Sequence, residues 1–307
     1  MIDKIDLEKL KSFVPETAFR LEEPLKNHTT FKVGGKADVF LSIQKAEQLQ
    51  NVLQYLKSRE IPFFIVGNGS NLLVSDGGYR GVILHIGNDF SGVEVTGTRI
   101  KAEAGALLSS VAAAAQKHSL TGLEFASGIP GSTGGAVVMN AGAYGGEMSQ
   151  VIESVTVLNQ DGTVTVLPLE QLDFSYRNSR IKKEKSIVLS VTFLLKQGNS
   201  KEIRGKMKDF ADRRREKQPL EYPSAGSTFK RPEGYYAGKL IMEAGLAGYS
   251  VGDAEVSEKH CGFIINKGHA TARDIYTLIR NVQKQVDNKF SVKLEPEVIF
   301  LGDMEKE

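Results

Sequence analysis

The sequence predicts an α+β protein with two or three domains, and three observations support this prediction. The chain has 307 residues, more than one ordinary domain needs. Segments with helical and strand-like patterns are mixed up to residue 195 without an internal repeat. The composition changes near residue 200, so we place one domain boundary at 200–218 and a softer one at 97–100.

The first two thirds of the chain contain the mixed elements. Apolar residues at positions i, i+3, i+4 and i+7 predict a helix over 45–58. The stretch "PFFIVGNGSNLLVSDGGYRGVILHI" predicts three strands separated by two glycine turns. "RIKAEAG" predicts a further strand, and an alanine-rich helix is expected over 107–118. Asp161-Gly162 lies between two β-rich segments and predicts a hairpin, which a strand over 186–195 follows.

The last third has a different pattern. An amphipathic helix is predicted from residue 200 to Pro219, and then a helix over 236–247 and a strand "CGFIIN". Thr271 and Asp274 have the spacing of a capping box for a long helix over 272–288. A final strand, "VKLEPEVIFLG", is predicted near the C-terminus.

Charge and composition exclude several classes of function. With 39 basic and 37 acidic residues the net charge is +2, which gives no argument for a nucleic-acid or membrane partner. The N-terminus lacks a signal-peptide core and no run approaches ~18 apolar residues, so we expect a cytoplasmic protein. Cys261, the single cysteine, is expected in the core, and the five histidines show no metal-ligand spacing.

Two glycine-rich stretches, "IVGNGSN" and "GIPGSTGGAVVMNAGAYGG", suggest a bound ligand. Gly67 and Gly69 precede another predicted strand rather than a helix, so they do not form the dinucleotide fingerprint. Glycine lets backbone N–H groups approach a ligand, and successive N–H groups form an anion-binding concavity. The two stretches together favour a cradle for one extended anionic ligand, with close backbone packing as the alternative.

Seven motifs, in order along residues 29–302, carry a family resemblance. They are "TTFKVGGKAD", "VGNGSNLLVSDGGYRGVIL", "TGLEFASGIPGSTGGAVVMNAGAYGGE", "YRNSR", "PSAGSTFKRP", "AGKLIMEAGLAG" and "KHCGFIIN". Together they resemble the UDP-N-acetylenolpyruvoylglucosamine reductase (MurB) family of peptidoglycan synthesis. The chain is most similar to the shorter, type II form, because it has no extra segment for the tyrosine loop of the longer form.

The resemblance implies an FAD-binding fold of the vanillyl-alcohol-oxidase type. Two α+β FAD-binding subdomains would cover residues 1–98 and 99–205. A smaller α+β substrate-binding domain would cover 206–307, with its C-terminal strand returning to the active site. The residues that the resemblance places against FAD lie in the two glycine-rich stretches: Gly67, Asn68, Gly69, Ser70, Asn71, Gly128, Ile129, Pro130, Gly131, Ser132, Gly134, Gly135, Ala141 and Gly142.

Three catalytic residues follow from the same resemblance. Arg177 in "YRNSR" would polarise the substrate carboxylate, for which a planar guanidinium fork is suited. Ser227 in "SAGSTFK" would donate the proton, with Ser224 and Thr228 as rival candidates. Glu297 in "LEPEVIF" would act with the arginine on the carboxylate.

The choice of glutamate has a competitor and a departure from the family pattern. Glu295 lies two residues before Glu297 and would share its face of a strand. Members of the family often carry an arginine two positions after this glutamate, where this chain has Ile299. A contact made by that arginine is therefore in doubt here.

Basic residues after the domain boundary are candidates for binding phosphates. Arg213, Arg214, Arg215 and Lys217 form a charge run at a predicted helix end, which is commonly a solvated face. The resemblance favours Arg214 and Lys217 of this run as substrate contacts. Outside the run, Arg231 and Tyr176 are weaker candidates for contacting the substrate.

The implied reaction is the NADPH-dependent reduction of UDP-N-acetylglucosamine enolpyruvate to UDP-N-acetylmuramate by a monomer. NADPH would reduce the flavin, and the flavin would pass hydride to the methylene carbon of the substrate. Two rival functions remain: another FAD-dependent oxidase or dehydrogenase of the same fold, and a nucleotide-binding module without catalysis.

Overall fold

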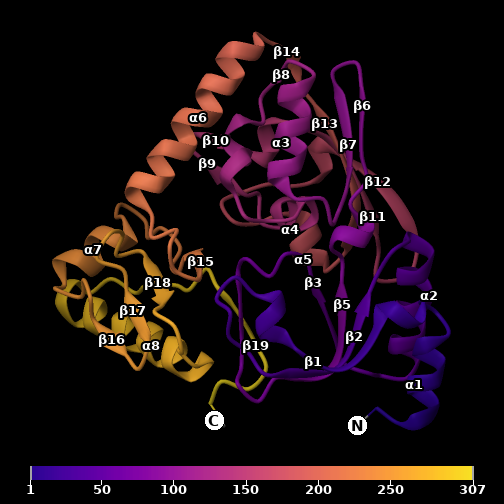
Figure 1. Ribbon diagram of the computed structural model, residues 1–307, viewed down its shortest axis with the longest axis horizontal. Coiled ribbons are helices and arrows are strands. Elements are labelled where there is room, and N and C mark those ends of the chain that lie inside the picture. The colour runs from indigo at the N-terminus through magenta and orange to yellow at the C-terminus, as the bar shows by residue number, and fades with distance from the viewer. Residues whose placement is uncertain (1, 306–307) are drawn as a thin grey trace. The chain divides into compact units, whose positions relative to one another are not determined.

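A computed structural model describes residues 2–305 and divides the chain into two compact units (Figure 1). Unit 1 comprises residues up to Arg20, Phe40–Asn68 and Val82–Arg213. Unit 2 comprises Leu21–Val39, Gly69–Gly81 and the chain from Arg214 onward. Helices and strands occur in both units, as an α+β fold requires.

Unit 1 contains a five-stranded antiparallel sheet of order β12-β11-β13-β7-β6. Its hairpin forms at Gly162, where φ is +87° and the Asp161 carboxylate accepts from the Thr163 backbone. The predicted hairpin is thus confirmed. The strand bounds are β6 Val93–Thr96, β7 Arg99–Glu103, β11 Ile152–Leu158, β12 Val164–Pro168 and β13 Ile187–Leu194.

Two helices, α3 (Leu108–Lys117) and α4 (Thr133–Val138), pack on one face of this sheet (Figure 1). Leu108, Val111 and Ala115 form the buried face of α3. The glycine-rich stretch therefore runs directly over a sheet, and this placement sets its packing.

A second sheet has the order β1-β2-β5-β3, and the chain passes from one unit to the other within β1, β2 and β5. Its β3 and β5 pair in parallel in unit 1, from Phe63↔Val82 to Val66↔His85. The bounds are β1 Phe19–Pro24, β2 Lys36–Ser42, β3 Phe63–Val66 and β5 Tyr79–His85.

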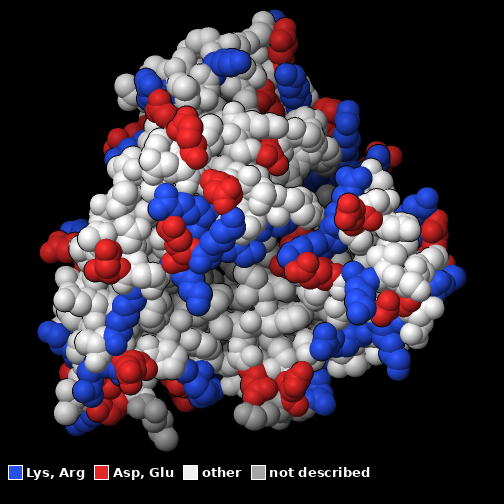
Figure 2. All heavy atoms as spheres, turned by 180° about the vertical axis from the view of Figure 1, so that it is seen from behind, with Lys and Arg blue, Asp and Glu red and all other residues white. Residues whose placement is uncertain are grey.

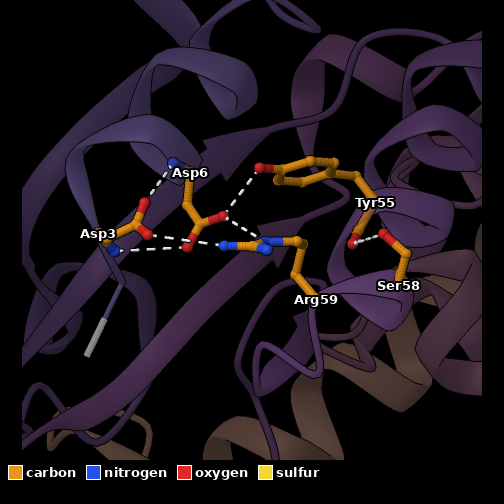
Figure 3. A network of polar contacts seen from close by, with 5 residues as sticks. All are labelled: Asp3, Asp6, Tyr55, Ser58 and Arg59. Carbon is orange, nitrogen blue, oxygen red and sulfur yellow. Dashed lines mark hydrogen bonds and ion pairs between the residues drawn. The ribbon is translucent and has the colours of Figure 1, made fainter.

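The N-terminal helix α1 (Lys4–Lys11) is tied to α2 (Ala46–Ser58) by a buried carboxylate (Figure 3). Asp6 accepts from the Tyr55 hydroxyl at 2.8 Å and from Arg59 Nε at 3.0 Å. Burial alone would raise the pKa of the Asp6 carboxyl, but these hydrogen bonds outweigh burial and hold the pKa below its ordinary value. This network therefore requires an ionised Asp6.

Unit 2 has a four-stranded sheet of order β15-β18-β17-β16 packed with two helices. One face of the long helix, including Ile275, Leu278 and Val282, is fully buried. The Thr271–Asp274 capping box forms as predicted, with bonds of 3.0 and 2.9 Å. The bounds are β15 Ser224–Ser227, β16 Ser250–Val251, β17 Ala254–Val256, β18 Phe263–Asn266, α7 Ala237–Glu243 and α8 Ala272–Phe290.

Short elements complete the two units. Antiparallel pairs join β8 to β14 and β9 to β10, and β4 pairs with β19 in parallel. The bounds of these strands and of the other α-helices are β4 Leu72–Val74, β8 Leu120–Thr121, β9 Gly142–Ala143, β10 Gly146–Glu147, β14 Lys196–Gln197, β19 Ile299–Leu301, α5 Arg180–Glu184 and α6 Ser200–Lys217. The 3-10 helices are Glu16–Ala18, Leu25–His28, Asn88–Phe90, Glu124–Gly128, Met148–Gln150 and Leu169–Gln171.

Three predicted elements differ from the structure. The final strand is only β19, so the preceding "VKLEPE" is not strand, and the argument that two glutamates share a strand face is wrong. The helix α7 ends at Glu243, because its chain turns at Gly245 with φ +81°. Cys261 lies before β18 rather than in it, although it is buried in the core as predicted.

The surface carries interspersed charges of both signs (Figure 2). On α6 they form i,i+4 ion pairs, such as Arg213 with Asp209 and Lys208 with Asp212. Of the 18 residues of α6 only Ile203 is buried, so this helix is more exposed than its amphipathic pattern predicts. Within residues 2–305, no helix is both long and apolar enough to cross a membrane.

Candidate active site

The two glycine-rich stretches touch each other in unit 1. A Cβ on Gly67 would lie 2.3 Å from Ser132 Oγ, so any other residue at this crossing would require Ser132 to shift. The Asn68 side-chain amide donates to the Pro130 carbonyl at 2.6 Å. The chain from Gly128 to Gly131 thus lies beside the first glycine turn, as a shared site requires.

Part of the glycine content serves packing rather than a ligand. The N–H of Gly134 donates to the Ala104 carbonyl at 2.8 Å, and a Cβ there would lie 3.0 Å from Ala104 Cβ. A Cβ on Gly142 would lie 2.7 Å from the Gly146 carbonyl oxygen. The Ala141 N–H donates to the Ala136 carbonyl. Close backbone packing therefore accounts for these residues, and their cofactor role stays a prediction.

Gly135 is a glycine that packing does not demand. It is exposed in the first turn of α4, where Ser132 caps its N–H at 3.4 Å. Among the described residues, a Cβ on Gly135 would come no closer than 3.5 Å, at Ser132 Oγ. Because glycine within a helix costs about 1 kcal/mol relative to alanine, its presence here favours a ligand that needs close access to the main chain.

The remaining predicted cofactor residues are placed as follows. Ile129 is half-buried, and its N–H donates to the Ala126 carbonyl. The Gly131 carbonyl accepts from the Leu108 N–H at 3.0 Å. Gly69 and Asn71 belong to unit 2, as does the half-buried Ser70. A Cβ on Gly69, whose φ is +59°, would lie 1.9 Å from the His28 carbonyl oxygen.

Arg177 occupies the third position of a tight turn in unit 1. The turn is closed by Ser175 and Asn178, whose backbones exchange two hydrogen bonds of 3.1 Å. At this position Arg177 has φ +54°, a left-handed conformation that favours glycine or asparagine. Its guanidinium lies over the Tyr176 ring, 5.1 Å from the centroid. Strain of this kind persists where the surroundings impose it, and it is common at functional sites.

This turn is fixed to the end of the glycine-rich stretch. Ser179, which is fully buried, donates its hydroxyl to the Val138 carbonyl at 2.9 Å and caps α5. The Asn140 amide donates to the Ser175 carbonyl at 3.3 Å. The turn that carries Arg177 is thereby hydrogen-bonded to Val138 and Asn140 of the second glycine-rich stretch.

Ser227 and its two rivals have different environments in unit 2. Thr228 is fully buried, its Oγ1 accepts from the Ile264 N–H at 3.1 Å, and its own N–H donates to the Gly262 carbonyl. Ser227 ends β15 and is exposed, whereas Ser224 is half-buried at the start of the strand. Thr228 is therefore closed to solvent and bonded within the protein, whereas Ser227 is exposed, and the identity of the proton donor stays a prediction.

Glu297 is held in the same framework as Ser227. Its N–H donates to the Thr228 carbonyl at 2.8 Å, and its carbonyl accepts from the Asn71 side-chain amide at 2.9 Å. Glu295, by contrast, is exposed and pairs with Lys230. The backbone of Glu297 is thus bonded to the residue that follows Ser227, whereas the side chain of Glu295 lies in a surface ion pair. Asn71, expected at the cofactor, has a positioning role that the sequence did not reveal.

The predicted substrate residues lie at exposed or half-buried positions. Lys217 ends α6, and Arg214 is half-buried one turn before it. Arg231 is exposed, and its guanidinium lies 4.0 Å from the centroid of the Tyr236 ring. Tyr176, stacked by Arg177, is also exposed.

Comparison with known proteins gives these positions their context. A family model described as the C-terminal domain of UDP-N-acetylenolpyruvoylglucosamine reductase matches residues 218–301, and an FAD binding domain model matches 37–167. The reductase of that name from Caldanaerobacter subterraneus is 53% identical over 300 residues, covering 98% of this chain and 99% of its own. The one from Clostridium novyi is 54% identical and covers 99% of both chains. This chain belongs to the UDP-N-acetylenolpyruvoylglucosamine reductase family.

Solved structures agree with this membership. The reductase from Thermus caldophilus matches with a TM-score of 0.79 and 37% identity, over 92% of this chain and 98% of that one. An alkyldihydroxyacetonephosphate synthase matches at 12% identity with a TM-score of 0.50 over 64% of this chain, which is a likeness of fold alone.

One buried charged residue beside the second glycine-rich stretch was not found from the sequence. Glu124 is buried and accepts from the Thr121 hydroxyl at 2.6 Å and the Gly122 N–H at 2.7 Å, just before the second glycine-rich stretch. Burial raises the pKa of its carboxyl, but these bonds and the positive charge of Lys206 outweigh burial, so the net pKa is lowered. The signal that could have identified Glu124 is its position as a lone glutamate within the apolar "TGLEFASG".

Proposed function

We propose that this chain reduces UDP-N-acetylglucosamine enolpyruvate to UDP-N-acetylmuramate, with FAD and NADPH, in peptidoglycan synthesis. Relatives named for this reductase activity match it over nearly its whole length, and an FAD binding domain model matches 37–167. We propose further that it acts as a cytoplasmic monomer. In this proposal, subdomains 1–98 and 99–205 bind FAD, and a domain over 206–307 binds the substrate.

The shared framework of Ser227 and Glu297 is the observation that carries the proposal. An exposed hydroxyl and a half-buried carboxyl are fixed through one residue, Thr228, whose side chain and backbone are fully bonded within unit 2. A proton donor and a carboxylate-binding group need such rigid support, because small displacements reduce proton transfer strongly. Packing alone does not require an exposed serine here.

The residues of the chain would divide the chemistry as follows. When bound, FAD would supply the hydride chemistry between NADPH and the enolpyruvyl group. Ser227 would donate its hydroxyl proton to the carbon next to the methylene carbon. Arg177 would bind the substrate carboxylate through its planar fork and, with Glu297, would stabilise the charge that develops there. Arg214, Lys217, Arg231 and Tyr176 would contact the diphosphate and the rest of the substrate.

Stopped-flow measurement of the two half-reactions tests this assignment. In Ser227→Ala, flavin reduction by NADPH should keep its rate, whereas flavin reoxidation by the enolpyruvyl substrate should slow by about 10²-fold or more. Ser224→Ala is the matched control, since this serine lies in the same strand, and both of its half-reactions should stay near the wild-type rates. Normal reoxidation in Ser227→Ala would show that another group donates the proton.

A second candidate function is that of another FAD-dependent oxidase or dehydrogenase of the same fold. An oxidase would return its flavin to the oxidised state with oxygen alone. Mixing the reduced protein with oxygen, with and without the enolpyruvyl substrate, separates the two functions. We expect the reduced flavin to be reoxidised much faster with the enolpyruvyl substrate than with oxygen alone.

A further inference from the structure

Lys182, on the helix that follows the Arg177 turn, reaches back to that turn. Its ammonium donates to the Arg177 carbonyl at 3.2 Å and to the Met139 sulfur at 3.7 Å. The next lysine, Lys183, pairs with the Asp173 carboxylate, as surface lysines commonly do. Because a long side chain loses rotamer freedom when it is held in one place, a contact with two neutral groups needs a cause beyond surface charge.

The bond from Lys182 completes the fixation of one peptide group. The peptide between Arg177 and Asn178 has two polar groups that point in opposite directions. Its N–H, from Asn178, donates to the Ser175 carbonyl at 3.1 Å, whereas its carbonyl, from Arg177, accepts from Lys182. A planar group that is bonded at both edges cannot rotate without breaking one of its bonds. Lys182 therefore helps to fix the direction in which the Arg177 side chain leaves the turn.

This fixation matters because Arg177 has a left-handed backbone, with φ +54°. A non-glycine residue keeps such a conformation only where its surroundings impose it. A peptide released at its carbonyl would rotate more freely, and the half-buried guanidinium would move with it. Small displacements of a group that binds the reacting part of a substrate reduce the rate strongly.

The main chain of Lys182 is itself tied to buried groups. Its N–H donates to Ser179 Oγ at 3.2 Å, and this fully buried hydroxyl donates to the Val138 carbonyl at 2.9 Å. Met139, which the ammonium contacts, directly follows Val138 in the second glycine-rich stretch. The exposed ammonium thus joins the Arg177 turn to the residue that follows α4.

We propose that Lys182 is a positioning residue for Arg177. Its ammonium holds the Arg177 carbonyl and so keeps the guanidinium directed at the substrate carboxylate. The proposal rests on the role of Arg177 in the proposed function, and it adds a lysine that the sequence did not single out. Lys182 acts through Arg177 in this assignment and touches no reacting group.

Lys182→Met in the full-length, FAD-loaded protein is the first test, since it removes the ammonium and keeps an apolar stem. Flavin reoxidation by the enolpyruvyl substrate should slow by about tenfold. The Kd for UDP-N-acetylmuramate, followed by flavin absorbance, should rise by about 3- to 10-fold, because the product keeps the carboxylate that Arg177 binds. Flavin reduction by NADPH and the unfolding temperature should stay near those of the wild type, since water replaces a bond at the surface.

Two further variants complete this comparison. Lys182→Arg can donate to the same carbonyl, and it should restore reoxidation and product affinity to within about threefold of the wild type. Lys183→Met removes the neighbouring ammonium, and both half-reactions should keep their wild-type rates. Unchanged reoxidation in Lys182→Met would overturn the proposal, as would a lowered unfolding temperature together with slower flavin reduction.

A double-mutant cycle separates positioning from a direct contact of Lys182 with the substrate. In Arg177→Ala, adding Lys182→Met should slow reoxidation by no more than about twofold, because the guanidinium that Lys182 positions is absent. A further tenfold loss in that background would show that Lys182 acts on the substrate itself, and the proposal would be wrong. If the reduced wild-type flavin is not reoxidised by the enolpyruvyl substrate, the proposed function itself fails, which is a distinguishable result.

Discussion

The left-handed backbone of Arg177 allows its proposed catalytic role and its effect on stability to be separated. Any substitution removes the guanidinium, but only glycine also relieves the conformation at φ +54°. We therefore compare Arg177→Gly with Arg177→Ala, which lose the same side-chain contacts. The difference between the two variants reports the backbone alone.

The expected difference in stability follows from two opposing terms. A left-handed conformation costs a non-glycine residue about 1–2 kcal/mol, and glycine avoids this strain. Glycine also raises the conformational entropy of the unfolded chain, which offsets about 0.4–1 kcal/mol. Arg177→Gly should therefore be more stable than Arg177→Ala by roughly 1 kcal/mol, or about 2–4 °C in thermal unfolding.

Urea unfolding and steady-state kinetics together check this reasoning. Both variants should lose at least about 10²-fold in turnover, since neither binds the substrate carboxylate. Arg177→Lys keeps the charge without the fork and should recover only part of the rate. Equal stability of the glycine and alanine variants would refute the strain argument, and normal turnover in either would refute the catalytic one.

Three further predictions concern the positions around this site. Asp6→Asn should lower the free energy of unfolding at neutral pH. The difference from the wild type should shrink as pH falls below 3.8, because Asp6 with its lowered pKa stabilises the fold only while its carboxyl is ionised. Urea unfolding at a series of pH values measures this difference. Gly67→Ala should destabilise by about 1–3 kcal/mol in the same assay, and adding Ser132→Gly should restore part of the loss. Glu295→Gln should leave turnover unchanged, while Glu297→Gln should reduce it strongly; equal kinetics would contradict our choice of glutamate.

Most helices and turns could be predicted from local sequence patterns, because the interactions that form them join residues close together in the chain. The helix at 46–58 follows the apolar repeat, and the turn at Gly162 follows from an aspartate and a glycine. The capping box at Thr271 forms because its two partners are three residues apart. The short β19 could not be predicted, since its length depends on its parallel partner β4, far away in the chain.

The sequence could nominate only those candidate site residues that lie within the family motifs. The left-handed conformation of Arg177 could not be predicted, because an arginine occupies the position where glycine or asparagine would mark it. The role of Asn71 depends on a contact with a residue 226 positions later. Long-range contacts of this kind are fixed by tertiary packing, which one sequence does not display.

The two glutamates show how such a contact decides between chemically equal candidates. Alternation along a strand would place Glu295 and Glu297 on one face, and the sequence then offers no physical reason to prefer either. The chain is not a strand there, and it forms a single bridge to Phe229 at Pro296 instead. Both backbones are bonded at this bridge: the Lys230 N–H donates to the Glu295 carbonyl, and the Glu297 N–H donates to the Thr228 carbonyl. The side chains differ, because Glu295 is exposed and pairs with Lys230, whereas Glu297 is half-buried. Two identical side chains thus acquire different environments on the two sides of one bridge.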